Sequence, residues 1–151
     1  MSSKLELIAE RLSHAEIFSD LCTEDLLAIA EFCSEETHFD GDVVMMEGES
    51  ANTMLVVERG KLALEKKVQI GRHSTPRNAT IAYVGPDQIA GFSSVVSPHE
   101  YSTSVVCVEP TRMIAIDGIA LRQYLQAHPE VGFKVMSTLA TLISGRYRGS
   151  I

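Results

Sequence analysis

Hydrophobic and polar positions divide the chain into a short helical opening, a long β region and two closing helices. In the opening, Leu5, Ile8 and Leu12 recur at helical spacing. The segment TEDLLAIAEF predicts a second helix, with Thr23 as its N-cap and acidic residues in its first turn. We therefore expect residues 1–36 to form a helical lead.

Between residues 37 and 116 the pattern changes to short apolar runs separated by glycine turns. Runs of this length and spacing are typical of an all-β barrel or jelly roll. We therefore expect a mainly β fold with flanking helices. The expected strands are Val43–Met46, Met54–Val57, Leu62–Leu64, Ile81–Val84, Val105–Val108 and Met113–Ile116.

Two helices are expected over residues 117–147. Asp117 is placed to cap the first of them, and Pro129 stands where the second begins. The second helix has an apolar stripe and an uncharged middle, and such a helix is usually covered on more than one side. We interpret residues 129–147 as a homodimer contact rather than a helix buried against its own roll. The stripe consists of Val135, Leu139 and Leu142, extended by Met136 and Ile143.

Composition limits the classes of function. The 151 residues suffice for a single domain over residues 1–151, and 13 basic against 20 acidic residues give a net charge of −7. Phosphate backbones and anionic lipids would repel such a protein, so we expect no direct nucleic-acid or membrane partner. Cys22, Cys33 and Cys107 are odd in number and lie in apolar patterns, which favours reduced, buried thiols in a cytoplasmic protein.

Candidate chemistry concentrates in IAGFSSVVSPHEYSTS, residues 89–104, which we call the cassette. It predicts a tight turn at Gly91, one helical turn, a loop broken by Pro98 and a strand start rich in hydroxyls. Turn amides and a helix N-terminus can hold a small anion, yet the segment contains no Arg or Lys. The candidate ligand-binding residues are Gly91, Phe92, Ser93, Ser94, Tyr101, Ser102 and Thr103.

The order of elements resembles that of the cyclic-nucleotide-binding domain family. DGDVVMMEGESANTMLVVERGKLAL resembles the first half of that domain, with Gly41, Gly48 and Gly60 at the matching turns. VGPDQIAGF resembles the approach to the family's phosphate-binding cassette, and VEPTRMIAIDGIALRQYLQAHPEV resembles its last strands and the following helix. The resemblance covers nearly the whole chain and implies a double-stranded β-helix, or jelly roll.

The family's cassette implies a specific set of ligand contacts. A glycine is followed by a Glu that holds the ribose hydroxyl, by helix amides that face the cyclic phosphate, and by an Arg that neutralises it. Gly91 matches the glycine, but Phe92 occupies the Glu position, and the Arg position falls on Tyr101, or on Ser102 if the loop is aligned one residue later. Two lost hydrogen bonds to charged groups, at roughly 1.5–3 kcal/mol each, weaken binding about 10²- to 10⁴-fold. We therefore expect no cAMP binding in the usual mode.

Three interpretations of the cassette remain. In the first, apolar side chains fill the cavity and leave a structural roll; they are Phe92, Val95 and Val96. In the second, polar side chains line a neutral pocket for an uncharged or differently oriented ligand; they are Ser93, Ser94, Tyr101, Thr103 and Ser104. In the third, basic residues of the preceding hairpin reach a bound anion; they are Lys66, Lys67, Arg72 and Arg77.

No catalytic constellation stands out. GFSSV lacks the closing glycine of a nucleophile elbow, and the five histidines lack metal-ligand spacing. Although His99 in the cassette supplies a ligand type that haem uses, we expect neither haem nor a metal. No helix-turn-helix segment follows the last helix, so we expect no DNA binding by this chain alone.

These observations predict a non-enzymatic regulatory module that dimerises and acts through protein–protein contacts. The alternative is a true receptor, in which a cyclic nucleotide or another small effector enters residues 91–104 and moves the C-terminal helices.

Overall fold

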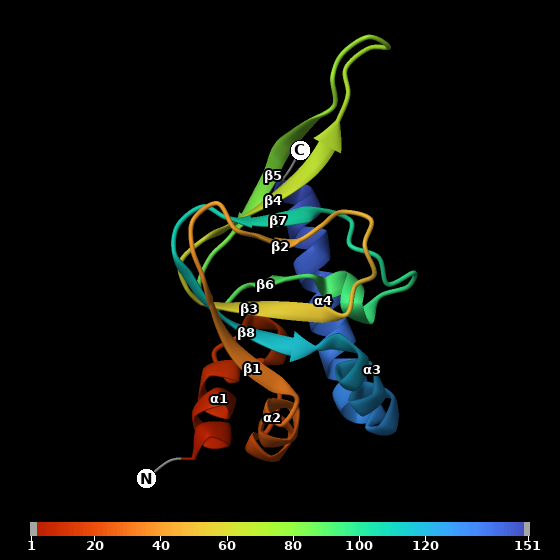
Figure 1. Ribbon diagram of the computed structural model, residues 1–151. Coiled ribbons are helices and arrows are strands. Elements are labelled where there is room, and N and C mark those ends of the chain that lie inside the picture. The colour runs from red at the N-terminus through yellow and green to blue at the C-terminus, as the bar shows by residue number, and fades with distance from the viewer. Residues whose placement is uncertain (1–2, 150–151) are drawn as a thin grey trace.

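Two four-stranded antiparallel sheets form a roll with helices at one end and along one side (Figure 1). The computed structural model describes residues 3–149, with side chains up to residue 145, so the ends of the expected 1–151 domain lie outside it. One sheet has the order β1-β8-β3-β6 and the other β2-β7-β4-β5. The strands are β1 (Cys33–His38), β2 (Val43–Met45), β3 (Thr53–Arg59), β4 (Leu62–Val68), β5 (Arg77–Val84), β6 (Ile89–Ala90), β7 (Ser104–Cys107) and β8 (Thr111–Asp117). The mainly β fold with flanking helices is confirmed.

The helices lie at both ends of the sequence and on the same side of one sheet. Those before the roll are α1 (Lys4–Leu12), the 3-10 turn η1 (Glu16–Phe18) and α2 (Thr23–Ala30). Within and after the roll come the 3-10 turn η2 (Phe92–Val95), α3 (Gly118–Ala127) and α4 (Pro129–Gly149). α2 begins at Thr23 with Cys22 as its N-cap, so the expected cap at Thr23 is wrong by one residue.

Side chains on the two faces of β3 contribute to two separate hydrophobic cores. Met54 and Val56 belong to the cluster shared with the helices, whereas Leu55 and Val57 belong to the cluster inside the roll. Successive side chains of a strand point to opposite faces, so one strand supplies both cores. This central position makes β3 a rigid base for the elements that contact it, including η2.

β1 corrects the boundary of the helical lead, because it starts at Cys33 rather than after residue 36. Its sequence, CSEETH, carries no apolar alternation. Glu35 of this strand instead joins an ion-pair network, 2.6 Å from Arg11 of α1 and also paired with Arg112 of β8. Glu58 of β3 contacts the same two guanidinium groups, and hydrogen bonding to Glu35 is the main cause that raises the pKa of Arg112.

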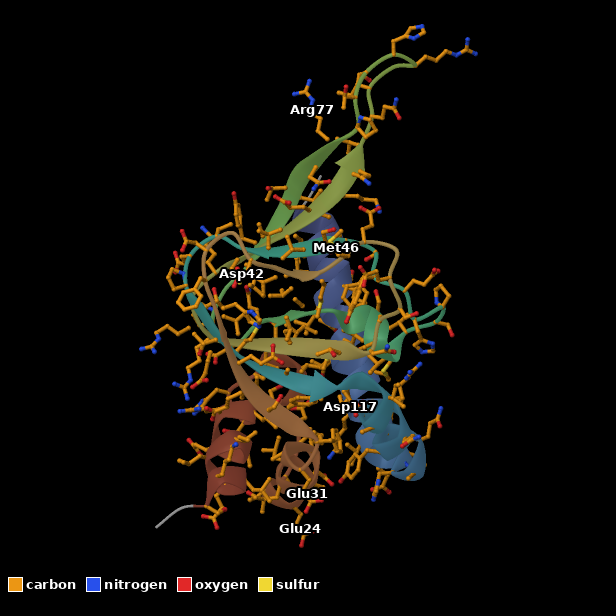
Figure 2. The ribbon with its side chains drawn as sticks, in the orientation of Figure 1. Glu24, Glu31, Asp42, Met46, Arg77 and Asp117 are labelled. Carbon is orange, nitrogen blue, oxygen red and sulfur yellow. The ribbon has the colours of Figure 1, made fainter. Side chains whose placement is uncertain are left out.

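The C-terminal helices begin as expected. Asp117 caps α3, since its carboxylate accepts the N–H groups of Ile119 and Ala120, and α4 begins at Pro129 (Figure 2). The tertiary role of α4 differs from the prediction. Val135 and Leu139 are buried in this chain's own helical core, with Leu139 only 1% exposed. Four of the five stripe residues therefore hold α4 against its own domain, and the fifth, Met136, is exposed.

The cysteines are unpaired but differ in environment. Cys107 is buried and Cys33 is half-buried, and burial raises the pKa of the Cys33 thiol to about 12. Cys22 is exposed, because it precedes the first turn of α2, so its expected burial is wrong. No helix in the described part of the chain combines the length and apolar character needed to cross a bilayer.

Candidate functional site

A pocket of about 140 Å³ lies between the cassette and the inner strands of the roll. Elements far apart in sequence build it: strands β2, β4, β5 and β7, the turn η2, the loop after it, and α4. The only α4 residue that lines it among those described is Ile143. The full lining is Met45, Leu64, Ile81, Ala82, Gly91, Phe92, Ser93, Tyr101, Ser102, Thr103, Val105 and Ile143.

Gly91 forms the floor of the cassette. Its φ of +82° is left-handed, and a Cβ there would lie 2.6 Å from Met45 Cε and 2.8 Å from the carbonyl oxygen of Thr53. Only glycine fits both the backbone and the space. Phe92 and Ser93 open the η2 turn, so their N–H groups have no acceptor within it. The predicted turn and helical turn are thus both present.

The loop after η2 is hydrogen-bonded to residues 48–51 by main-chain groups. The N–H of Gly48 donates to the Tyr101 carbonyl (2.9 Å), and the N–H of Tyr101 donates to the Glu49 carbonyl (2.9 Å). The N–H of Ala51 donates to the His99 carbonyl at 2.8 Å. Both main-chain groups of Tyr101, one of the two residues expected at the family's Arg position, are therefore bonded to the segment 48–51.

Tyr101 uses its side chain for structure. Its hydroxyl donates to the carbonyl of Thr53 (2.9 Å) and accepts from the N–H of Thr53 (3.2 Å), while its ring packs against the core inside the roll. Desolvation by burial is the largest cause that raises the pKa of this phenol, which keeps it neutral. Tyr101, one of the two residues expected at the family's Arg position, therefore joins the cassette to β3, and it offers a bound anion no charge.

Three other hydroxyl groups line the pocket: those of Ser93, Ser102 and Thr103. None of them is bonded to another group within the described residues. Ser93 is buried and Ser102 is exposed, so the pocket extends from the surface into the roll. Ser104, also expected in a polar pocket, lies outside it, because its hydroxyl accepts the N–H of Glu47 (3.0 Å).

Of the seven candidate ligand-binding residues, Ser94 is the one that does not line the pocket. It is 0% exposed and faces α3, where a Cβ on Gly118 would lie 2.6 Å from Ser94 Cβ. Its hydroxyl has no hydrogen-bond partner. Residues of a 3-10 turn point in different directions, so Ser93 and Ser94 face opposite sides of the cassette.

Replacing Ser94 by alanine is expected to raise the free energy of unfolding by about 1 kcal/mol, since it removes a buried polar group without a partner. Urea denaturation measures the change. Ser102→Ala, at an exposed position, serves as the control and should stay within about 0.5 kcal/mol of the parent. A loss of stability in Ser94→Ala would show that the hydroxyl is hydrogen-bonded in solution.

The interpretation that apolar side chains fill the cavity is wrong for two of its three residues. Val95 belongs to the core shared with the helices, and Val96 packs against that core. Phe92 is half-buried and lines the pocket without closing it. An open, uncharged pocket remains, since none of its described lining residues carries a charge.

Of the four hairpin cations, one reaches the cassette. Lys66 Nζ donates to the Ser102 carbonyl at 3.0 Å, and it lies 3.6 Å from a carboxylate oxygen of Glu47. The Glu47 carboxylate also accepts the N–H of Lys67 (2.9 Å), and this hydrogen bond is the main cause that lowers its pKa. Lys66 therefore sits outside the pocket beside its counter-charge.

The distal part of the hairpin points away from the site. Beyond the body of the roll, β4 and β5 extend as a projecting arm, and Arg77 begins β5 next to the loop at the tip of this arm (Figure 2). His99 does not line the pocket either. It lies on a separate surface groove together with residues of α3 and α4, among them Arg122 and Phe133.

Comparison with known proteins places this geometry in a family. The sequence profile of the family described as "Cyclic nucleotide-binding domain" matches residues 36–128. A "CRP-like cAMP-activated global transcriptional regulator" of Mycobacterium tuberculosis is 23% identical over 131 residues, which are 87% of this chain and 56% of that protein. The "Cyclic AMP receptor protein" of Thermus thermophilus is 25% identical over 135 residues, which are 87% of this chain and 57% of the relative. The chain thus spans little more than half the length of these relatives.

Solved structures agree on the fold. A cyclic nucleotide-binding domain from Methylobacillus flagellatus superposes with a TM-score of 0.75 at 26% identity, covering 97% of this chain and 79% of that one. The regulatory subunit of a cAMP-independent protein kinase A from Trypanosoma brucei gives a TM-score of 0.74 at 16% identity, over 92% of this chain and 47% of that chain. At this lower identity the likeness concerns the fold alone.

Proposed function

The chain belongs to the cyclic nucleotide-binding domain family, and we propose that it is one cytoplasmic, non-enzymatic regulatory module that does not bind cAMP in the usual mode and acts through protein–protein contacts. Relatives named as transcriptional regulator and receptor support the regulatory role. Three unpaired cysteines support a reducing compartment. The net charge of −7 argues against direct nucleic-acid binding.

One observation carries the proposal: the site that would hold a cyclic phosphate is lined by uncharged residues, and Tyr101 is bonded to the backbone of Thr53. An anion buried without a cation loses its hydration and gains no compensating ion pair. At about 140 Å³ the pocket is also smaller than the roughly 300–1,000 Å³ of pockets that take drug-sized ligands.

The exposed face of α4 is the proposed surface for protein contact. Phe133 is 75% exposed and Met136 is 38% exposed, although the opposite side of the helix is buried. Large exposed apolar side chains are costly in water unless a partner covers them. We propose a homodimer through this face, within residues 129–147. Of the stripe predicted from sequence, the face keeps Met136, whereas Val135 and Leu139 are buried in the chain's own core.

A second candidate function is that of a receptor for another small effector, and the open pocket beside α4 favours it. The pocket remains open, and Ile143 brings α4 to its wall. A ligand there would contact the same helix that presents Phe133 to a partner. This arrangement can link pocket occupancy to the protein-contact face.

Restoring the two family charges tests the main proposal. The variant Phe92→Glu, Tyr101→Arg removes two rings from the wall of the small pocket and adds both charges, so we expect it to gain a cAMP-dependent rise in melting temperature. At a hundredfold excess over Kd a ligand stabilises its protein by about 2.7 kcal/mol. Differential scanning fluorimetry with cAMP and cGMP measures it. The uncharged pair Phe92→Gln, Tyr101→Gln is the matched control and should gain nothing. If both variants respond equally, the missing charges do not explain the loss of binding.

A further inference from the structure

We propose that the pocket binds a small uncharged molecule built around a single ring and carrying a hydrogen-bonding substituent. The inference rests on the second function proposed above, the effector receptor, and names the ligand class of that site. It follows from the size of the pocket, the character of its walls and its unpaired hydroxyls.

The volume sets the size of the ligand. About 140 Å³ of free space is close to the roughly 150 Å³ of an apolar protein cavity that accepts benzene. A nucleotide, with a bicyclic base, a sugar and a phosphate, needs more room than this. A single substituted ring matches this volume.

The walls favour a ring without charge. Seven of the twelve lining residues have purely apolar side chains: Met45, Leu64, Ile81, Ala82, Phe92, Val105 and Ile143. They come from the sheet β2-β7-β4-β5, from η2 and from α4, so they surround the space rather than form one flat face. Contact with such walls removes apolar ligand surface from water, which is the main source of affinity for a ligand of this kind.

The hydroxyls of Ser93, Ser102 and Thr103 define the polar substituent. They line the pocket and have no bonding partner within the described residues. A hydroxyl both donates and accepts, so these groups can bind an alcohol, a phenol or an amide. A carboxylate or phosphate would meet donors but no cation, because no described lining residue is charged. Lys66, which bonds to the Ser102 carbonyl of the cassette, is held outside the pocket beside Glu47.

Benzyl alcohol and benzoate form a matched pair for the test, because they share a ring and differ in charge. Titration of each into the isotope-labelled chain, followed by methyl resonances in a two-dimensional NMR spectrum, reports binding at Ile143, Ala82 and Val105. We expect benzyl alcohol to bind with a Kd of about 1 mM or tighter and to shift these methyls. Benzoate should bind at least tenfold more weakly, because its charge would be buried without a partner.

Two variants locate the binding. Ala82→Leu adds bulk to the pocket wall and should weaken benzyl alcohol at least tenfold, whereas Ala79→Leu, on the same strand but outside the lining, should not. Thr103→Val keeps the shape and removes a hydroxyl; a two- to tenfold loss is expected if that hydroxyl bonds the ligand.

The outcomes separate this inference from the main proposal. Equal binding of benzoate, no binding of either probe, or equal binding to Ala82→Leu would each overturn the inference. None of these results would bear on the loss of the usual cAMP mode, which the charge-restoring variant tests.

Discussion

Gly91→Ala is expected to lower the free energy of unfolding by about 2–5 kcal/mol. A left-handed conformation costs a residue with a Cβ roughly 1–2 kcal/mol, and overpacking against Met45 and the Thr53 carbonyl adds roughly 1–3 kcal/mol. Chemical denaturation monitored by circular dichroism measures the loss.

Gly41→Ala separates the two causes. Gly41 has a similar φ of +90°, but no atom lies within 4 Å of a Cβ built there. This control should lose only the conformational part, about 1–2 kcal/mol. If the two variants lose the same stability, the cassette is not packed tightly against β2 and β3, and the geometry of the pocket floor is wrong.

Leu139→Ala is expected to lower the free energy of unfolding of the single chain by about 2–5 kcal/mol, as is usual when a fully buried leucine is truncated. The reason is that Leu139 packs in the core shared with the N-terminal helices and η2, not at a dimer surface. Urea denaturation at low micromolar concentration measures this loss.

Phe133→Ala, on the exposed face of the same helix, is the matched control. It should change single-chain stability by less than about 0.5 kcal/mol, and it should shift the dimer towards monomer in light scattering at tens of micromolar. If Leu139→Ala instead left stability intact and abolished the dimer, the positions of the two faces of α4 would be reversed.

The sequence predicted strands best where burial makes apolar residues recur at regular spacing. All six expected strands overlap β2, β3, β4, β5, β7 and β8, and each of these strands contains at least one buried residue, although Met46 and Val108 lie outside the strands expected to contain them. β1 escaped prediction because its polar side chains are stabilised by Arg11 and Arg112, which lie far away in sequence. β6 has two residues, too few to show any alternation.

The sequence predicted which residues form the site better than it predicted where their side chains point. Six of the seven candidate residues line the pocket, and local sequence located them through the Gly91 turn. Two facts depend on tertiary contacts: Ser94 faces α3, and the Tyr101 hydroxyl bonds to β3. Ile143 lies 38 or more positions from every other residue that lines the pocket, so no local pattern could have placed it there.

The apolar stripe of α4 shows how one pattern supports two interpretations. Val135 and Leu139 have the same spacing whether they face a partner chain or their own core. Sequence gives the direction of the face relative to the helix, but only packing determines what covers it. The exposed Phe133, flanked in sequence by Gly132 and Lys134, gave no periodic signal of its own.

Isothermal titration calorimetry of cAMP into the unmodified chain tests the central claim most directly. A pocket without a cation or an acid at the two family positions should give no saturable heat up to about 1 mM nucleotide, since the missing contacts weaken binding by about 10²- to 10⁴-fold. A saturable titration with a micromolar Kd would contradict the claim.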